Sequence, residues 1–187
     1  SERILPSVEP PDEKSAIATI RAALDLGINV IDTAPAYGFG RAEEIVGRAL
    51  AGGRRANTII ATKVGLEWRD GQVFRNSPPA RLRTELEDSL RRLQTDVIDL
   101  YQVHWPDESV PLEESAATLA GFQREGKIRA IGVSNFSPAQ MDRFRSAAPL
   151  SAVQPPYNLF EREIERDILP DAKRYGLTVL AYGALCR

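Results

Sequence analysis

The 187-residue sequence predicts an α/β fold of the (β/α)8 TIM-barrel type, with about six βα units evident in the chain. Short apolar runs alternate with amphipathic segments of 10 to 17 residues, the pattern of parallel strands connected by helical crossovers. Polar side chains follow each apolar run, at the carboxyl end of each expected strand. A barrel builds its active site from all of these ends, whereas a doubly wound sheet does so only at its switch point. We therefore expect residues 1–187 to form a single, incomplete barrel domain.

The individual elements follow from capping residues and from apolar spacing. Residues 1–11 contain three prolines and are expected to be irregular. Asp12 is a suitable N-cap for a helix whose apolar residues recur at helical spacing until Gly27, and Pro79 suits the first turn of a later helix. The polar residues 65–78 are expected to form a long loop. Strands are expected at 29–32, 58–64, 97–104, 128–135, 151–158 and 178–185, and further helices at 42–50, 78–94, 111–127, 137–148 and 161–175.

The composition is that of an ordinary globular domain and argues against several kinds of partner. With 43% hydrophobic residues, a net charge of -2 and no basic block, the chain gives no reason to expect nucleic acid or an anionic membrane as partner. No apolar run approaches the roughly 18 residues of a membrane span, and the N-terminal residues lack the apolar core of a signal peptide. The single cysteine, Cys186, excludes an internal disulfide framework and fits a reducing compartment. We expect a cytoplasmic protein without a zinc site, since one His and one Cys cannot form a Cys/His cluster.

Two stretches come close to nucleotide-binding motifs without meeting their requirements. Gly38 and Gly40 begin a G-x-G-x-x-G pattern, but its third position is Glu43, whose carboxylate would face a pyrophosphate. Residues 121–127 fit the first part of a P-loop, but they lead from a helix into a strand, which is the reverse of the P-loop order. We expect Gly126 in this stretch to end a helix instead.

Four ionisable side chains stand at or just beyond neighbouring strand ends: Asp32, Tyr37, Lys63 and His104. Reducing a carbonyl group requires a hydride for carbon and a proton for oxygen, and an ordinary tyrosine, with a pKa of about 10, is a reluctant donor. A lysine ammonium beside Tyr37 would favour the phenolate, and Asp32 would keep that ammonium charged and oriented. His104 could hydrogen-bond the substrate oxygen or the phenol. Each residue alone also suits an ordinary structural role, so their order along the strand ends carries the catalytic hypothesis.

The segments that hold these residues resemble the signature segments of the aldo-keto reductases. They read IDTAPAYGFGRAEEIVGRAL, ATKVGL, DVIDLYQVHWPD, GKIRAIGVSNFS, VQPPYNLFERE and LAYGALCR, and the resemblance covers about residues 12–187. It implies a (β/α)8 barrel, NADPH bound without a Rossmann domain, and a catalytic tetrad formed here by Asp32, Tyr37, Lys63 and His104. The chain would then be an NADPH-dependent oxidoreductase that reduces aldehydes or ketones to alcohols, with Tyr37 as the proton donor.

The same resemblance implies a cofactor site. Ser134, Asn135 and Gln154 would hydrogen-bond the carboxamide of the nicotinamide, and Tyr182 would stack on its ring. This is chemically reasonable, since these side chains match the donors and acceptors of a carboxamide and an aromatic platform holds a planar ring.

Three aromatic residues suggest a substrate pocket next to this site. Trp105 directly follows the histidine, and Trp68 and Phe39 lie in expected loops above it. Together they could line an apolar pocket for a small carbonyl substrate. The identity of that substrate does not follow from the sequence, because it depends on how such loops are placed.

The sequence departs from the family pattern at both ends. A closed barrel takes about 250 residues and eight strands. The first strand of the family is represented at best by residues 4–8, and no segment corresponds to the last strand, which normally holds the adenosine and the 2′-phosphate. An incomplete parallel barrel has two unpaired edges, so we expect such a chain to self-associate or to be partly ordered. Two alternatives therefore stay open: a non-catalytic nicotinamide-nucleotide sensor or scaffold subunit, and an inactive fragment.

Overall fold

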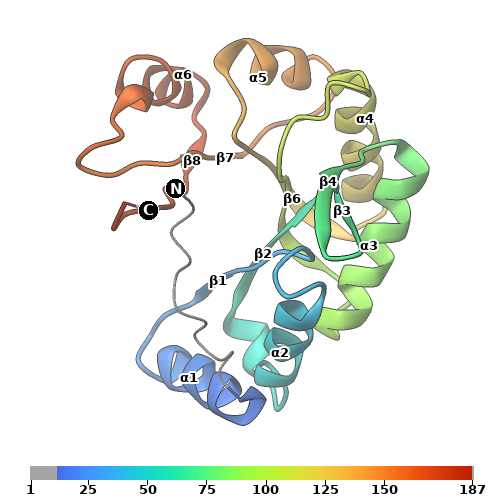
Figure 1. Cartoon of the computed structure of the whole chain (residues 1–187), viewed down its shortest axis with the longest axis vertical. Helices are drawn as coiled ribbons and strands as arrows, with labels where there is room; N and C mark the ends of the chain where they lie inside the picture. Colours follow the sequence, from blue (N-terminus) through green and yellow to red (C-terminus); the bar gives the residue numbers. More distant parts are fainter. Residues whose placement is uncertain (1–11, 187) are drawn as a thin grey trace.

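The structure, a computed structural model of the chain, describes residues 12–186. Six parallel strands form one sheet, and their order across the sheet is their order in the sequence. They are β1 (Val30–Asp32), β2 (Ile59–Val64), β5 (Ile98–Val103), β6 (Ile128–Ser134), β7 (Ala152–Gln154) and β8 (Thr178–Val179). The sheet curves into a half-barrel that is open on the left in Figure 1. The expected fold of the TIM-barrel type, with about six βα units, is confirmed.

Helices lie outside the half-barrel, on the convex side of the sheet (Figure 1). They are α1 (Glu13–Asp25), α2 (Arg41–Ala49), α3 (Pro79–Leu93), α4 (Leu112–Arg124), α5 (Pro138–Arg145) and α6 (Ile168–Tyr175), with the single-turn 3-10 helices η1 (Arg54–Asn57) and η2 (Glu163–Glu165). Asp12 caps α1 by accepting a hydrogen bond from the backbone N–H of Ser15 at 3.1 Å. Gly126 follows the end of α4 with a φ of 75°, so the expected helix stop is present.

The main core lies between the sheet and the helices. Its fully buried side chains include Ile60, Leu82, Leu86, Leu93, Tyr101, Phe122 and Ile131. A smaller cluster of Ala61, Leu100 and Ala152 occupies the inner face of the half-barrel. Since side chains two residues apart in a strand share a face, that inner face also carries Lys63 and Gln102. Small apolar side chains thus fill its lower part and leave polar ones near the carboxyl ends of the strands.

The expected loop at 65–78 contains a β-hairpin, so this expectation was wrong. Strands β3 (Leu66–Arg69) and β4 (Gln72–Arg75) pair antiparallel across a two-residue turn. Asp70 and Gly71 form the turn with φ values of 52° and 78°. Positive φ at both positions matches the right-handed twist of the strands, which is why an Asp-Gly pair favours a tight hairpin.

The last two units also differ from the expected ranges. A helix over 161–175 would place Pro170 in its interior, where the missing N–H and the ring would break it. The segment divides instead into η2 and α6, and Pro170 lies in the first turn of α6. The strand expected at 151–158 stops at Gln154 because the next two residues are prolines and cannot donate to the ladder. The strand expected at 178–185 covers only two residues, followed by one isolated bridge between Pro156 and Tyr182.

The half-barrel has open edges within the described part of the chain. There, β1 pairs with β2 alone and β8 with β7 alone. Residues 1–11, including the short apolar run at 4–8, lie outside the described residues. Between residues 12 and 186, none of the helices has the length and apolar character needed to span a membrane.

Candidate active site

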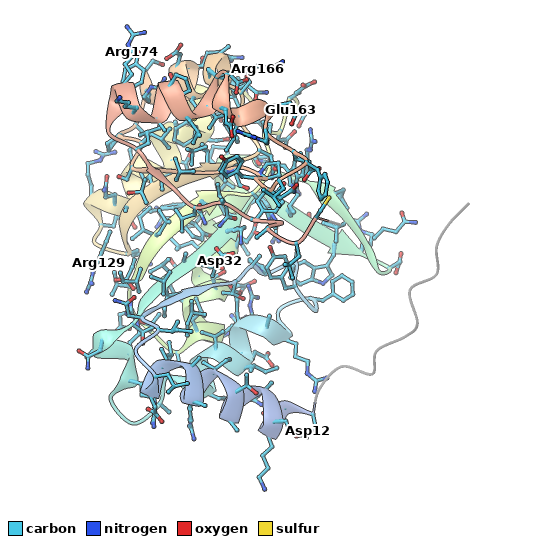
Figure 2. All side chains as sticks on the ribbon, turned by 90° about the vertical axis from the view of Figure 1, so that its left-hand side faces the viewer. Asp12, Asp32, Arg129, Glu163, Arg166 and Arg174 are labelled. Carbon is cyan, nitrogen blue, oxygen red and sulfur yellow. The ribbon has the colours of Figure 1, made fainter. Side chains whose placement is uncertain are left out.

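The polar side chains expected at the strand ends meet on the inner face of the half-barrel. Asp32 ends β1, Lys63 lies one residue before the end of β2, and His104 directly follows β5. Ser134 and Gln154 end β6 and β7. Figure 2 looks onto the open side of the sheet and places Asp32 near the middle of this face. Parallel strands bring their carboxyl ends to one edge, which explains why residues so far apart in the sequence come together.

Lys63 is the centre of this group. Its side chain is 1% exposed, and its Nζ donates hydrogen bonds to Asp32 Oδ2 at 2.8 Å and to the backbone oxygen of Thr33 at 2.9 Å. The same Nζ lies 3.4 Å from the phenol oxygen of Tyr37 and 5.0 Å from the centre of its ring. A buried ammonium needs both a counter-charge and hydrogen-bond acceptors, and these neighbours supply them.

Tyr37 and His104 face each other beside the lysine. Tyr37 lies in the turns between β1 and α2 and is 44% exposed, and its ring meets the imidazole edge-on at a centroid distance of 5.9 Å. Burial is the main cause that lowers the pKa of His104 to about 4; the Lys63 ammonium acts in the same direction and Asp32 opposes it. The imidazole is therefore neutral near neutral pH: it keeps one N–H for hydrogen bonding but lacks the second proton that would make it an acid.

A second group of side chains is connected by hydrogen bonds on the other side of the strand ends. The phenol of Tyr182 donates to Asn135 Oδ1 at 2.7 Å, and Asn135 Nδ2 donates to Ser134 Oγ and to the backbone oxygen of His104, both at 3.0 Å. Ser134 Oγ donates in turn to the backbone oxygen of Gln154 at 2.8 Å. Asn135 has a φ of 63°, a left-handed conformation that asparagine adopts more readily than most residues.

These two groups enclose one pocket of about 360 Å³. It is lined by Asp32, Tyr37, His104, Trp105, Ser134, Asn135, Gln154 and Tyr182, with Lys63 buried beneath. The structure thus gathers nine of the eleven predicted site residues. The other two, Phe39 and Trp68, pack against each other at a centroid distance of 5.8 Å and do not belong to this lining.

The aldo/keto reductase family profile matches residues 5–187. The chain belongs to the aldo/keto reductase family. Among curated relatives, aldo-keto reductase YhdN of Bacillus subtilis is 61% identical over 177 residues, which are 94% of this chain and 54% of YhdN. The NADH-specific methylglyoxal reductase of Escherichia coli is 36% identical over 187 residues, 93% of this chain and 57% of the relative.

Solved structures of the family share the fold in detail. The glycerol dehydrogenase AKR11B4 from Gluconobacter oxydans superposes with a TM-score of 0.91 at 58% identity, covering 95% of this chain and 56% of that one. An aldo/keto reductase from Klebsiella pneumoniae in complex with NADP and acetate gives a TM-score of 0.79 at 35% identity, covering 91% and 58%. This aldo/keto reductase chain therefore spans little more than half the length of the relatives it matches.

Sequence reasoning missed Gln102 in this aldo/keto reductase. Its buried amide points at Asp32, with Nε2 3.5 Å from Oδ1, and Gln154 Nε2 donates to the same oxygen at 3.2 Å. Gly132 makes room for it, because a Cβ at this position would lie 2.8 Å from Gln102 Cγ. The available signal was a glutamine inside the otherwise apolar end of a buried strand, two residues before the histidine.

The near-match to a dinucleotide motif has a structural explanation in the same molecule. Glu43 is fully buried and accepts hydrogen bonds from Arg92 Nε at 2.7 Å and from Thr62 Oγ1 at 2.6 Å. Its carboxylate thus joins α2 to α3 and β2 instead of facing the pocket.

Proposed function

We propose that this chain is the catalytic part of an NADPH-dependent oxidoreductase that reduces aldehydes or ketones to alcohols, with Tyr37 as the proton donor. The observation that carries the proposal is the contact of buried Lys63 with both Asp32 and the phenol oxygen of Tyr37, at 2.8 and 3.4 Å. A charged lysine held against a half-exposed phenol is an arrangement suited to proton transfer at a pocket. Family membership, with relatives named as reductases and dehydrogenases, supports the same reaction.

The roles of the four residues follow from their contacts. Tyr37 gives its proton to the carbonyl oxygen, and the Lys63 ammonium stabilises the phenolate that is left. Asp32 keeps the lysine charged and oriented. His104, neutral because its pKa is about 4, positions the substrate oxygen by a hydrogen bond. Because Tyr37 is 44% exposed, water can reach the phenol and restore its proton after each turnover.

The remaining lining residues fit a nicotinamide. When bound, the reduced cofactor supplies the hydride for the carbonyl carbon. Ser134, Asn135 and Gln154 offer hydroxyl and amide groups for its carboxamide, and Tyr182 offers an aromatic face for its ring. A pocket of about 360 Å³ has room for a nicotinamide ring with a small carbonyl substrate.

The choice of NADPH over NADH is part of the proposal. The Klebsiella relative was solved with NADP, whereas the E. coli relative is named NADH-specific. Titration of the protein with each reduced dinucleotide, followed by addition of a generic aldehyde, tests it. Turnover with NADPH well above that with NADH supports the proposal, and tight binding without turnover would favour the non-catalytic sensor or scaffold role.

Substitution of Tyr37 by Phe tests the proton donor. Turnover should fall by about 100-fold or more, because a general acid typically contributes that much, while NADPH binding stays nearly intact. The matched control is Tyr175→Phe, because Tyr175 is 43% exposed but lies on α6. If Tyr37→Phe turned over substrate as fast as the control, Tyr37 would not be the proton donor.

Three further proposals concern the chain as a whole. We propose that it forms one domain, which a single cooperative unfolding transition would support. We propose that the isolated chain self-associates through the edges of β1 and β8. A cytoplasmic location is proposed from the single cysteine, and cell fractionation tests it.

A further inference from the structure

Tyr182 lines the pocket although it lies beyond the end of a regular strand. Strand β8 ends at Val179, and Tyr182 meets the neighbouring segment through one isolated bridge. Its backbone N–H donates to the oxygen of Pro155 at 3.1 Å, and its own oxygen accepts from the N–H of Tyr157 at 3.0 Å. Pro155 and Pro156 have no backbone N–H, so they cannot donate hydrogen bonds to the segment that contains Tyr182.

Asn158 fixes the chain on both sides of this bridge. It is 9% exposed, and its Oδ1 accepts from the N–H groups of Phe160 and Glu161 at 2.9 and 3.0 Å, which closes a turn. Its Nδ2 donates to the backbone oxygen of Gly183 at 3.1 Å and to Glu161 Oε2 at 2.6 Å. One amide therefore ties the turn after β7 to the carbonyl group of Gly183, the residue that directly follows Tyr182.

Apolar burial does little to hold this turn. Leu159 and Phe160 are 85% and 81% exposed. Gly183 has a φ of 72°, and because glycine adopts negative φ values just as readily, this conformation needs contacts from elsewhere to be fixed. In a segment with so little buried apolar surface, local order depends on hydrogen bonds. The amide of Asn158 makes four of them, two through the oxygen and two through the nitrogen.

We propose that Asn158 is a positioning residue: it holds Tyr182 where its ring can support the nicotinamide, acting through the hydrogen bond to Gly183. The proposal rests on the proposed function for the part that concerns the nicotinamide. The placement of Tyr182 itself is a property of the chain alone and can be measured without any cofactor.

The test removes the Nδ2 donor of residue 158 and keeps the Oδ1 acceptor. In the double variant Asn158→Asp/Glu161→Gln, the oxygen still closes the turn and the charge repulsion with Glu161 is removed, but the hydrogen bond to Gly183 is lost. The matched control is Asn76→Asp/Glu67→Gln, because Asn76 Nδ2 donates to Glu67 Oε2 at 2.5 Å near the hairpin. Reduced nicotinamide mononucleotide is the probe. Its Kd should rise about tenfold in the first variant and stay unchanged in the control, as expected for one lost hydrogen bond.

Two further measurements separate positioning from general damage. Amide hydrogen exchange at Tyr182 and Tyr157 should speed up by about tenfold in the Asn158 variant, while the amide of Leu180, bonded to Val153 at 3.0 Å, should exchange as before. In a Tyr182→Leu background, the Asn158 change should add nothing to the loss of mononucleotide binding.

The proposal would be overturned if amide hydrogen exchange at Tyr182 were unchanged in the Asn158 variant. It would also be overturned if exchange became faster by the same factor at Tyr182, Tyr157 and Leu180. If exchange changes locally but the wild-type chain does not bind the mononucleotide, the proposed function fails while the positioning of Tyr182 by Asn158 stands. If the mononucleotide binds and its Kd is the same in both double variants, the link from Asn158 to the cofactor is refuted.

Discussion

At the scale of single residues, the site combines a charged lysine with a neutral histidine, and each of them contacts Tyr37. Lys63 has Asp32 as its counter-charge, whereas His104 has no carboxylate of its own among the contacts of the described residues. Burial and the nearby ammonium both disfavour a second positive charge. The pocket therefore holds its positive charge on the lysine, directly behind the phenol of Tyr37, the proposed proton donor.

This charge distribution can be checked on the only histidine of the chain. The imidazole should titrate with a midpoint of about 4 in the folded protein, compared with 6.5 for an ordinary histidine. Proton NMR needs no assignment here, since a single imidazole gives the signals. A midpoint near 6.5 would contradict the buried, neutral role. The catalytic rate should accordingly show no histidine step between pH 6 and 8.

Most of the residues around Lys63 could be predicted from the sequence, but Gln102 could not. The order of Asp32, Lys63 and His104 at successive strand ends predicted their meeting, because parallel strands place such ends together. Gln102 could not be found in the same way. It lies deeper in the strand, and its importance depends on the missing Cβ of Gly132 on the neighbouring strand, a contact between residues 30 positions apart.

At the scale of elements, alternation predicted the six units of the sheet, but local backbone chemistry decided their lengths. Consecutive prolines ended β7, and Pro170 fixed the start of α6. The hairpin β3–β4 was not predicted because each of its strands is only four residues long and half of their residues are polar. Asp70 and Gly71 were its signal, and a tight turn should have been read from that pair.

One contact between elements has a consequence for stability. Glu85 on α3 is 1% exposed and accepts a hydrogen bond at 3.2 Å from the N–H of Gly65, the residue that joins β2 to the hairpin. Burial raises the pKa of Glu85 to about 8, against the opposing effects of Gly65 and Arg81. The carboxyl group is therefore protonated in the folded protein at neutral pH.

The sign of the pH dependence follows from proton binding. Between pH 4.5 and 8 the unfolded chain has released the Glu85 proton and the folded chain has not, so the free energy of unfolding falls as pH rises, by about 1.4 kcal/mol per pH unit. For His104 the folded pKa is the lower one, so its contribution rises with pH between about 4 and 6.5. The contributions of Glu85 and His104 offset each other up to about pH 6.5. Between pH 6.5 and 8 only that of Glu85 remains, and the free energy of unfolding falls by ~2 kcal/mol.

Glu85→Gln should abolish this fall, because a neutral amide keeps an acceptor for Gly65 and does not ionise. Chemical denaturation at pH 6.5 and at pH 8 gives the free energy of unfolding of each variant, and the difference between the two values measures the fall. The control Glu87→Gln lies on the same helix at a side-chain exposure of 46% and should retain the fall. An equal slope in the Glu85 variant and the control would show that this carboxyl group is not the source.

At the scale of the whole molecule, helices cover the outer side of the half-barrel, and within residues 12–186 the sheet ends in two open edges, at β1 and β8. Close to the β1 edge, Leu26, Ile28 and Val30 are 87%, 55% and 41% exposed. A parallel strand with one open edge, flanked by exposed apolar side chains, is a template for association. The same half-barrel already contains the complete group around Lys63, so the proposed proton-transfer site and the open edges belong to one unit.

The isolated chain should therefore scatter light as a species larger than its 20.6 kDa monomer, with a mass that rises with concentration. Val30→Lys should shift it toward the monomer, because a charge on an edge strand opposes pairing. Val73→Lys, at a residue of 47% exposure on the hairpin, is the control and should leave the mass unchanged. A compact wild-type monomer at all concentrations would refute this expectation.

The close approach of Gly132 to Gln102 also constrains how this site can evolve. A methyl group at 132 would lie 2.8 Å from Gln102 Cγ, so the amide beneath Asp32 can persist only while position 132 has no side chain. The clash thus penalises a side chain at position 132 as long as Gln102 is present. A directed-evolution library that varies position 132 should therefore vary position 102 with it, because a side chain at 132 needs a smaller or displaced neighbour at 102.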